Sequence, residues 1–80
     1  MLIHVIKISA DYILTKPIHK SQVLVKKFAD DFIKIQINLI VNFELKAHLL
    51  SYGANIEILE PEVLRMAMYD LYNEALKKYQ

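Results

Sequence analysis

Three histidines, three serines and one pair of adjacent aspartates are the first candidates for chemistry in this 80-residue chain. No two of His4, His19 and His48 have the i, i+4 spacing of a helical metal site. The chain contains no Cys, so thiolate ligands, Cys nucleophiles and disulfides are excluded. His4 alternates with apolar residues and is predicted to be a partly buried structural residue. The sequence therefore predicts no metal and no cofactor.

The sequence also shows no arrangement of residues for nucleophilic catalysis. Ser9, Ser21 and Ser51 lack the flanking glycines of a nucleophile elbow, and no local base can be assigned to them. A single Gly in the whole chain also excludes the phosphate-binding loops that need several. We interpret Asp30 and Asp31 as a solvated turn. The protein is predicted not to be an enzyme.

The charge balance argues against an electrostatic nucleic-acid binder. Ten Lys or Arg oppose nine Asp or Glu, for a formal net charge of +1, whereas such binders usually gather a basic excess on one face. Sheets that bind RNA stack bases on aromatic residues of their central strands. The strand after residue 31 places Lys34, Gln36 and Asn38 on its polar face, with Phe32 only at its beginning. Single-stranded nucleic-acid binding by this domain is therefore kept only as an alternative.

Neither a membrane span nor a leader is indicated by the sequence. No apolar run reaches the roughly 18 residues that a spanning helix needs. The opening MLIHVIKIS lacks a basic segment and a cleavage site of small residues. We expect a soluble, cytoplasmic protein without membrane contact.

The elements that position these residues begin with a short β-branched strand over residues 2–8. Ser9 or Asp11 is expected to cap a short helix, which Pro17 ends. Residues 21–41 read as two strands around a turn at residues 29–31. Alternating apolar residues from Ile33 to Val41 give the second of these strands one buried face.

The second half of the chain predicts a helix, a strand and a longer helix. Asn42 caps the first helix, which runs to about Tyr52 and ends at Gly53 in the left-handed conformation. Its apolar stripe is assigned to Phe43, Ala47 and Leu50, with Leu45 and Leu49 beside it. A short strand holds Ile56 and Ile58. Pro61 starts the last helix, which runs to about Lys78.

The order β-α-β-β-α-β plus a C-terminal helix predicts an α+β fold, a ferredoxin-like antiparallel sheet with one additional helix. At 55% hydrophobic residues, the chain can form one domain over residues 1–80. The predicted core includes seven isoleucines: Ile6, Ile8, Ile33, Ile35, Ile37, Ile56 and Ile58.

Two crossover helices cover only one face of such a sheet. The last helix, with a stripe that includes Leu64 and Met68, could cover the second face and leave a monomer. It carries further apolar residues off that stripe, and surplus apolar surface marks interfaces. We predict a homodimer that uses the open sheet face or the last helix, in which Met66 or Tyr69 becomes buried.

Three linked motifs resemble the C-terminal extension of WYL-domain transcriptional regulators. They are PIHKSQ at residues 17–22, ELKAHLLSYG at residues 44–53 and ILEPEVLR at residues 58–65. The match runs in order from about Ile3 to Tyr79. The Trp-Tyr-Leu motif of the WYL domain and the N-terminal helix-turn-helix of those regulators are absent from the printed sequence, which contains no Trp.

This resemblance implies a regulatory and oligomerisation domain of a bacterial transcription factor. DNA would be bound only through other parts of the parent chain, and the effector would be a nucleic acid or a small molecule. A small-molecule-binding ferredoxin-like module is the alternative from another class. His19, Ser21, Gln22 and Arg65 are the candidate polar contact surface, because an Arg fork can hold a carboxylate or phosphate. Locally, Arg65 is expected to pair with Glu60 or Glu62.

Overall fold

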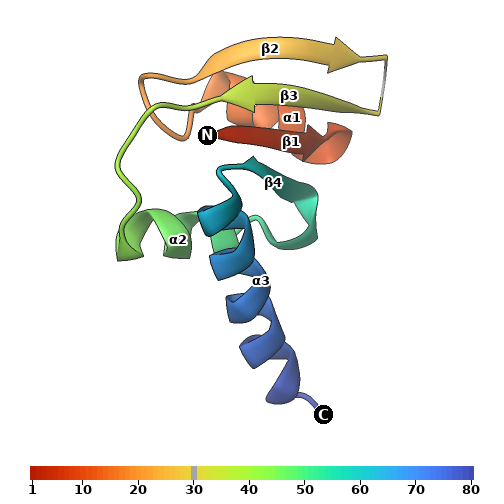
Figure 1. Ribbon diagram of the computed structural model, residues 1–80. Coiled ribbons are helices and arrows are strands. Elements are labelled where there is room, and N and C mark those ends of the chain that lie inside the picture. Colours follow the sequence, from red (N-terminus) through yellow and green to blue (C-terminus); the bar gives the residue numbers. More distant parts are fainter. Residues whose placement is uncertain (30) are drawn as a thin grey trace.

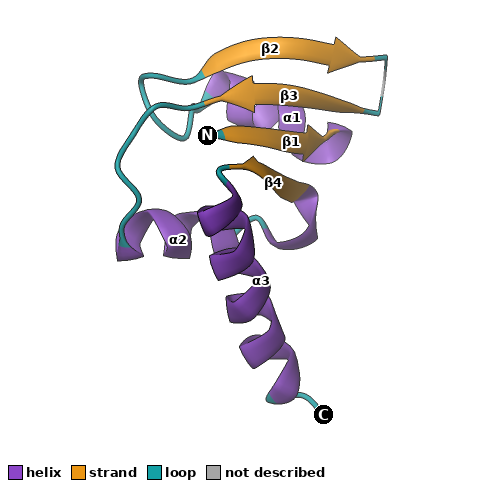
Figure 2. Ribbon diagram, viewed as in Figure 1, coloured by secondary structure: helices purple, strands orange, loops and turns teal. Residues whose placement is uncertain are grey.

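The computed structural model describes residues 1–29 and 31–80, which form a four-stranded antiparallel sheet and three α-helices (Figure 1). This confirms the predicted α+β class. The elements, coloured by type in Figure 2, follow in chain order: β1 (Leu2–Ile6), α1 (Lys7–Thr15), β2 (Val23–Phe28), β3 (Phe32–Gln36), α2 (Phe43–Leu50), a 3-10 turn (Gly53–Asn55), β4 (Ile56–Glu60) and α3 (Glu62–Lys77).

The sheet has the strand order β2-β3-β1-β4, with every neighbouring pair antiparallel. Ile3 of β1 lies opposite Ile35 of β3 and Ile58 of β4. All three side chains are buried, so one face of the sheet forms the core. The helices contribute Ile13, Leu49 and Leu64 to the same cluster.

The assignment of faces along β1 was wrong. Ile3 and Val5 are completely buried, whereas Ile6 is 41% and Ile8 79% exposed. β1 ends at Ile6, and Ile8 belongs to α1. The expected Ser or Asp cap of α1 is also wrong, because Ile6 is the N-cap residue and no side chain caps the helix.

The prediction of a buried face on β3 is confirmed in its first half. Ile33, Ile35 and Ile37 are buried, but regular pairing stops at Gln36 rather than at Val41, which is exposed. The amide of Ile37 still donates to the carbonyl of Met1 at 2.9 Å. Of the expected turn at residues 29–31, Asp30 lies outside the described residues.

For α2, the cap is confirmed and the buried stripe is corrected. The Asn42 side chain accepts a hydrogen bond from the amide of Leu45 at 2.8 Å. Leu45 and Leu49 are buried, while Phe43 is 84% exposed, so the helix turns the neighbouring stripe toward the sheet. It ends at Leu50, two residues earlier than expected. Gly53 has φ +57°, as the left-handed stop requires.

The last helix does not cover the open face of the sheet. Leu64 and Met68 of α3 are buried in the same cluster as Ile58 of the edge strand β4. Figure 1 shows α1 behind the sheet, while α3 leaves beyond β4 with its C-terminal end pointing away. Among the described elements, no helix therefore packs across the sheet face that carries His4 (Figure 1), and only the Arg65 side chain of α3 reaches its β4 edge. None of the helices described is long and apolar enough to cross a membrane.

Candidate functional site

The polar residues between α1 and β2 form a closed turn. The His19 ring nitrogen Nδ1 lies 2.8 Å from the Ser21 hydroxyl, which accepts a hydrogen bond from the Asn38 amide at 2.8 Å. The Gln22 side chain accepts from the amide of Ile18 and donates to the carbonyl of Ile13. The structure thus brings His19, Ser21 and Gln22 together and engages each of them locally. These bonds fix the chain between α1 and β2, and ligand contact by this turn stays a prediction.

Arg65 belongs to a different part of the surface. Its Nη1 donates to Glu57 Oε2 at 3.1 Å and to the carbonyl of Ile58 at 2.8 Å. The prediction that Arg65 pairs with Glu60 or Glu62 was wrong, because the Arg65 side chain reaches back along β4 instead of staying within its own turn. Among the described residues, no hydrogen bond or ion pair joins Arg65 to the turn at residues 17–22.

The open face of the sheet carries an aromatic cluster, formed by His4 of β1, Phe28 of β2 and Phe32 of β3. The two phenylalanine rings stack with centroids 4.4 Å apart and planes 17° apart. The imidazole lies 4.7 Å from the Phe32 ring and 5.6 Å from the Phe28 ring. All three side chains are half-buried. Antiparallel pairing explains this meeting, since Phe28 lies directly opposite Phe32 and His4 opposite Lys34.

Cations surround this aromatic cluster. The Lys26 ammonium lies 4.8 Å and the Lys34 ammonium 5.7 Å from the centre of the Phe28 ring. Such contacts contribute about 0.5–1 kcal/mol each at exposed sites. On the other side of the cluster, Glu57 Oε1 lies 3.8 Å from His4 Nδ1 and ties the imidazole to Arg65. The face therefore combines stacked rings with positive charge.

The second nitrogen of His4 is unusual. Its Nε2 atom is shielded from solvent and has no hydrogen-bond partner among the described residues. An unpaired buried polar atom is destabilising, because its lost hydration is not replaced by a hydrogen bond. The position of His4 as a partly buried residue of β1 agrees with the prediction, but its role in an aromatic cluster was missed.

The sequence contains only a weak signal for the aromatic cluster. Phe28 and Phe32 flank the expected turn symmetrically, so hairpin pairing alone places them opposite each other. His4 joins them only because β1 lies beside β3, a pairing over some thirty residues of chain. The prediction against base stacking rested on Phe32 alone, without Phe28 and His4.

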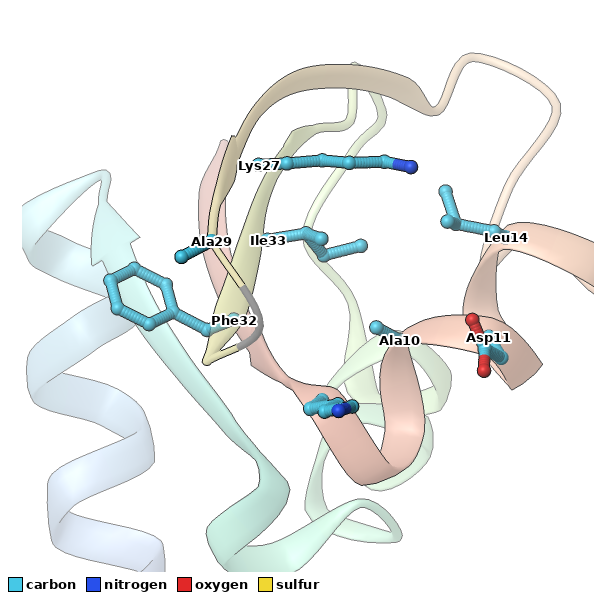
Figure 3. A pocket seen from close by; sticks show the side chains of 8 residues that line it. Ala10, Asp11, Leu14, Lys27, Ala29, Phe32 and Ile33 are labelled. Atoms are coloured by element: carbon cyan, nitrogen blue, oxygen red, sulfur yellow. The ribbon is translucent and has the colours of Figure 1, made fainter.

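Three hollows occur on the described surface. The smallest, of about 160 Å³, lies between α1 and the β2–β3 hairpin. Figure 3 shows Lys27 extending across it toward Leu14, with Ile33 directed inward and the Phe32 ring turned to the opposite side of the sheet. Asp11 is the acidic residue on its helical wall. This hollow therefore has mixed charge, from Lys27 and Asp11, and its described residues form no cluster of ligating groups.

Both larger hollows involve α3. One, of about 250 Å³, lies beside β4 and includes Arg65, Met68 and Tyr69. The Tyr72 hydroxyl, at its margin, donates to the Gly53 carbonyl at 3.1 Å, and burial raises the pKa of Tyr72. The other, of about 360 Å³, lies between α2 and α3. Of the predicted dimer residues, Met66 is 49% and Tyr69 63% exposed in this single chain.

Metal-binding and catalytic arrangements are not apparent in this surface. Within residues 1–29 and 31–80, no group of three His, Asp or Glu side chains is placed to hold an ion. What the surface does offer is contact area: the aromatic cluster on the sheet and apolar hollows along α3.

Comparison with known proteins identifies one family. A family model described as the WCX domain matches residues 5–76, nearly the whole chain. None of the curated proteins matches this sequence.

Proposed function

The chain belongs to the WCX family, the C-terminal extension of WYL-domain regulators, and we propose that it contributes dimerisation and effector response to a bacterial transcriptional regulator. WCX is a family of regulatory domains and not a known enzyme family. In this proposal DNA is bound by other parts of the parent protein, and residues 1–80 act as one domain.

The observation that carries the proposal is the large apolar surface outside the core. On α3 alone, Val63 is 82%, Met66 49% and Tyr69 63% exposed. Exposed apolar area of this extent is typical of surfaces that bind another protein. A closed pair of identical subunits is the commonest arrangement that covers such area.

We also assign the fold to the ferredoxin-like class. The order β2-β3-β1-β4, with helices connecting β1 to β2 and β3 to β4, supports this assignment. It leaves one sheet face free for contacts with the rest of a regulator.

Sedimentation equilibrium of the 80-residue chain over micromolar concentrations tests the dimerisation part. We expect a mass that rises from 9.4 kDa toward twice that value as concentration increases. A mass that stays at 9.4 kDa would contradict dimerisation by this domain. Sequencing the genomic reading frame upstream of Met1 tests the regulatory context, because the proposal expects a helix-turn-helix and a WYL domain in the same frame.

A second candidate function, binding of single-stranded nucleic acid, is favoured by the aromatic cluster. Rings on strands of one open sheet face are used for base stacking, and adjacent cations neutralise phosphates. Here Phe28 and Phe32 supply the rings and Lys26 and Lys34 the charge. Against it stands the mutual stacking of the two rings, which already uses one face of each.

Fluorescence anisotropy with a labelled single-stranded oligonucleotide decides this candidate. With Lys26 and Lys34 as contacts, the logarithm of affinity should fall with the logarithm of salt with a slope of about −1.4, roughly 0.7 for each cation. The double change Lys26→Glu, Lys34→Glu should abolish binding, and Lys77→Glu on α3 is the matched control. Absence of binding at about 50 mM salt would remove the candidate.

A further inference from the structure

The groove between α2 and α3 is the largest of the three hollows described above, with a volume of about 360 Å³. Its apolar lining comes from both helices: Ala47 and Leu50 of α2 with Ala67 and Leu71 of α3, and Phe43 of α2 at its edge. The α2 residues are the helical stripe that the sequence predicts: Phe43 and Ala47 are exposed, and Leu50 packs only partly against the core. A regular apolar stripe left mostly out of the core points to a contact outside the subunit.

The rim of the α2–α3 groove has opposite charges on its two sides. Lys46 stands on the α2 side, and Asp70 and Glu74 stand on the α3 side. Within the described part of the chain these three groups form no ion pair with one another. A positive side and a negative side along one groove are self-complementary under a two-fold rotation, because the rotation brings each α2 over the partner's α3. Lys46 of one subunit then faces Asp70 and Glu74 of the other.

Phe43 provides the side chain that such a pairing would insert. It is the first residue of α2, it lines the groove, and it is 84% exposed. Each subunit therefore presents an exposed aromatic ring and, beside it, an apolar groove that the ring of a second subunit can enter. A two-fold pair uses both elements twice, since each ring enters the other subunit's groove.

We infer that the α2–α3 groove is the surface on which a second copy of this chain binds, with Phe43 of each subunit seated in the groove of the other. This inference rests on the dimerisation proposed above and specifies its surface. It places Lys46 in ion pairs with the partner's acidic rim, and it differs from an interface on Tyr69, which lies on the β4 side of α3.

Replacement of the ring is the first test. Phe43→Ser should raise the dimer dissociation constant at least tenfold in sedimentation equilibrium, because buried aromatic side chains dominate interface energies. The circular dichroism spectrum should be unchanged, since Phe43 contributes almost no buried area to the single subunit. Ile8→Ser is the matched control: Ile8 is 79% exposed near the start of α1, far from the groove, and its replacement should leave the dissociation constant unchanged.

Charge reversal is the second test. Lys46→Glu should weaken the dimer, and Glu74→Lys should weaken it as well, with a stronger effect at low salt. The combination of Lys46→Glu and Glu74→Lys should restore the dimer in part, because it re-creates one pair of opposite charges across the two-fold axis while Asp70 stays acidic. If both single variants unfold like the wild type, this recovery reports contacts between subunits and not within one.

The outcomes separate this inference from the proposal beneath it. A wild-type chain that stays monomeric contradicts both dimerisation and this surface. A wild-type dimer that tolerates Phe43→Ser, or that is lost on Tyr69→Ser instead, contradicts the groove alone and leaves dimerisation standing. Loss on Phe43→Ser together with recovery in the charge-reversed pair supports the α2–α3 groove.

Discussion

At the scale of single residues, Gly53 shows how backbone geometry selects an amino acid. Its φ of +57° is in the left-handed region, which costs residues with a Cβ about 1–2 kcal/mol. A Cβ built at Gly53 meets no atom within 4 Å, so the surroundings add no clash. The requirement for Gly is therefore conformational alone.

Replacing Gly53 should destabilise the domain by that backbone cost. We expect Gly53→Ala to lower the free energy of unfolding by about 1–2 kcal/mol, and Gly53→Val to lower it further because β-branched residues tolerate this region least. Gly53→Asn should cost less, since Asn enters the left-handed region more readily. Urea unfolding measures all three, and equal losses for Ala and Asn would refute the conformational explanation.

Tyr72 links α3 to the turn after α2 through its hydrogen bond to the Gly53 carbonyl. Burial raises its pKa in the folded state, so the contribution of Tyr72 is fully present below its ordinary pKa and is lost as pH rises through the raised value. Tyr72→Phe should destabilise the domain near neutral pH, at the lower end of about 0.5–1.5 kcal/mol because the hydroxyl is partly exposed.

The difference between wild type and Tyr72→Phe should narrow above about pH 10, where the ordinary tyrosine ionises. Urea unfolding between pH 7 and this alkaline range measures it. Tyr69→Phe, at a hydroxyl more exposed to solvent, is the control and should behave as wild type. A Tyr72→Phe curve parallel to wild type at all pH values would show that the hydroxyl proton makes no difference.

At the scale of elements, the sheet shows that the neighbouring elements decide which face of a strand or helix is buried. In β3 the alternation of the sequence was sufficient to predict the buried face, because Ile33 and Ile35 alternate with polar residues and only one face can be apolar. In β1 both faces carry isoleucine, and the pairing of Ile3 with Ile35 and Ile58 selects the face. The same holds for α2, where two adjacent stripes are apolar and the sheet packs against Leu45 and Leu49.

A charge placed at Ile35 should prevent folding. Ile35 has no exposed surface and lies in the central strand β3, where it pairs with Ile3 of β1. Ile35→Asp would bury a carboxylate without a partner, a cost of several kcal/mol in a small domain. We expect no cooperative thermal transition for Ile35→Asp. Gln36→Asp, on the exposed side of the same strand, should melt like the wild type, and a normal transition for Ile35→Asp would refute the register.

At the scale of the whole molecule, α3 has only part of its apolar surface inside the subunit. Leu64 and Met68 reach the core beside β4, whereas the second half of the helix extends beyond the sheet (Figure 1). Leu76 is 54% and Tyr79 90% exposed there. These exposed apolar residues support the dimerisation that we propose.

An acidic residue at Met66 should weaken self-association without unfolding the subunit. Met66 is 49% exposed on α3, so Met66→Glu removes little from the core. In a dimer that covers this side of α3, the two new carboxylates would be desolvated and the dissociation constant should rise. Sedimentation equilibrium measures the constant, and thermal unfolding checks the subunit. An unchanged constant would place Met66 outside the interface.

The sequence by itself determined the features whose causes are local. Asn42 caps α2 because its side chain bonds an amide three residues ahead. Gly53 takes a positive φ and Pro61 precedes α3 for steric reasons that need no distant partner. The order of strands and helices, the α+β class and the family resemblance follow from such signals read in sequence, and the WCX match confirms the last of them.

Only the tertiary structure decided what depends on residues far apart in the chain. His4 meets Phe28 and Phe32 because β1 pairs with β3 across some thirty residues. Arg65 selects Glu57 because α3 returns along β4. The groove beside Phe43 exists because α2 turns its other stripe inward. In each case the sequence offered several apolar or charged neighbours, and packing free energy summed over the whole domain made the selection.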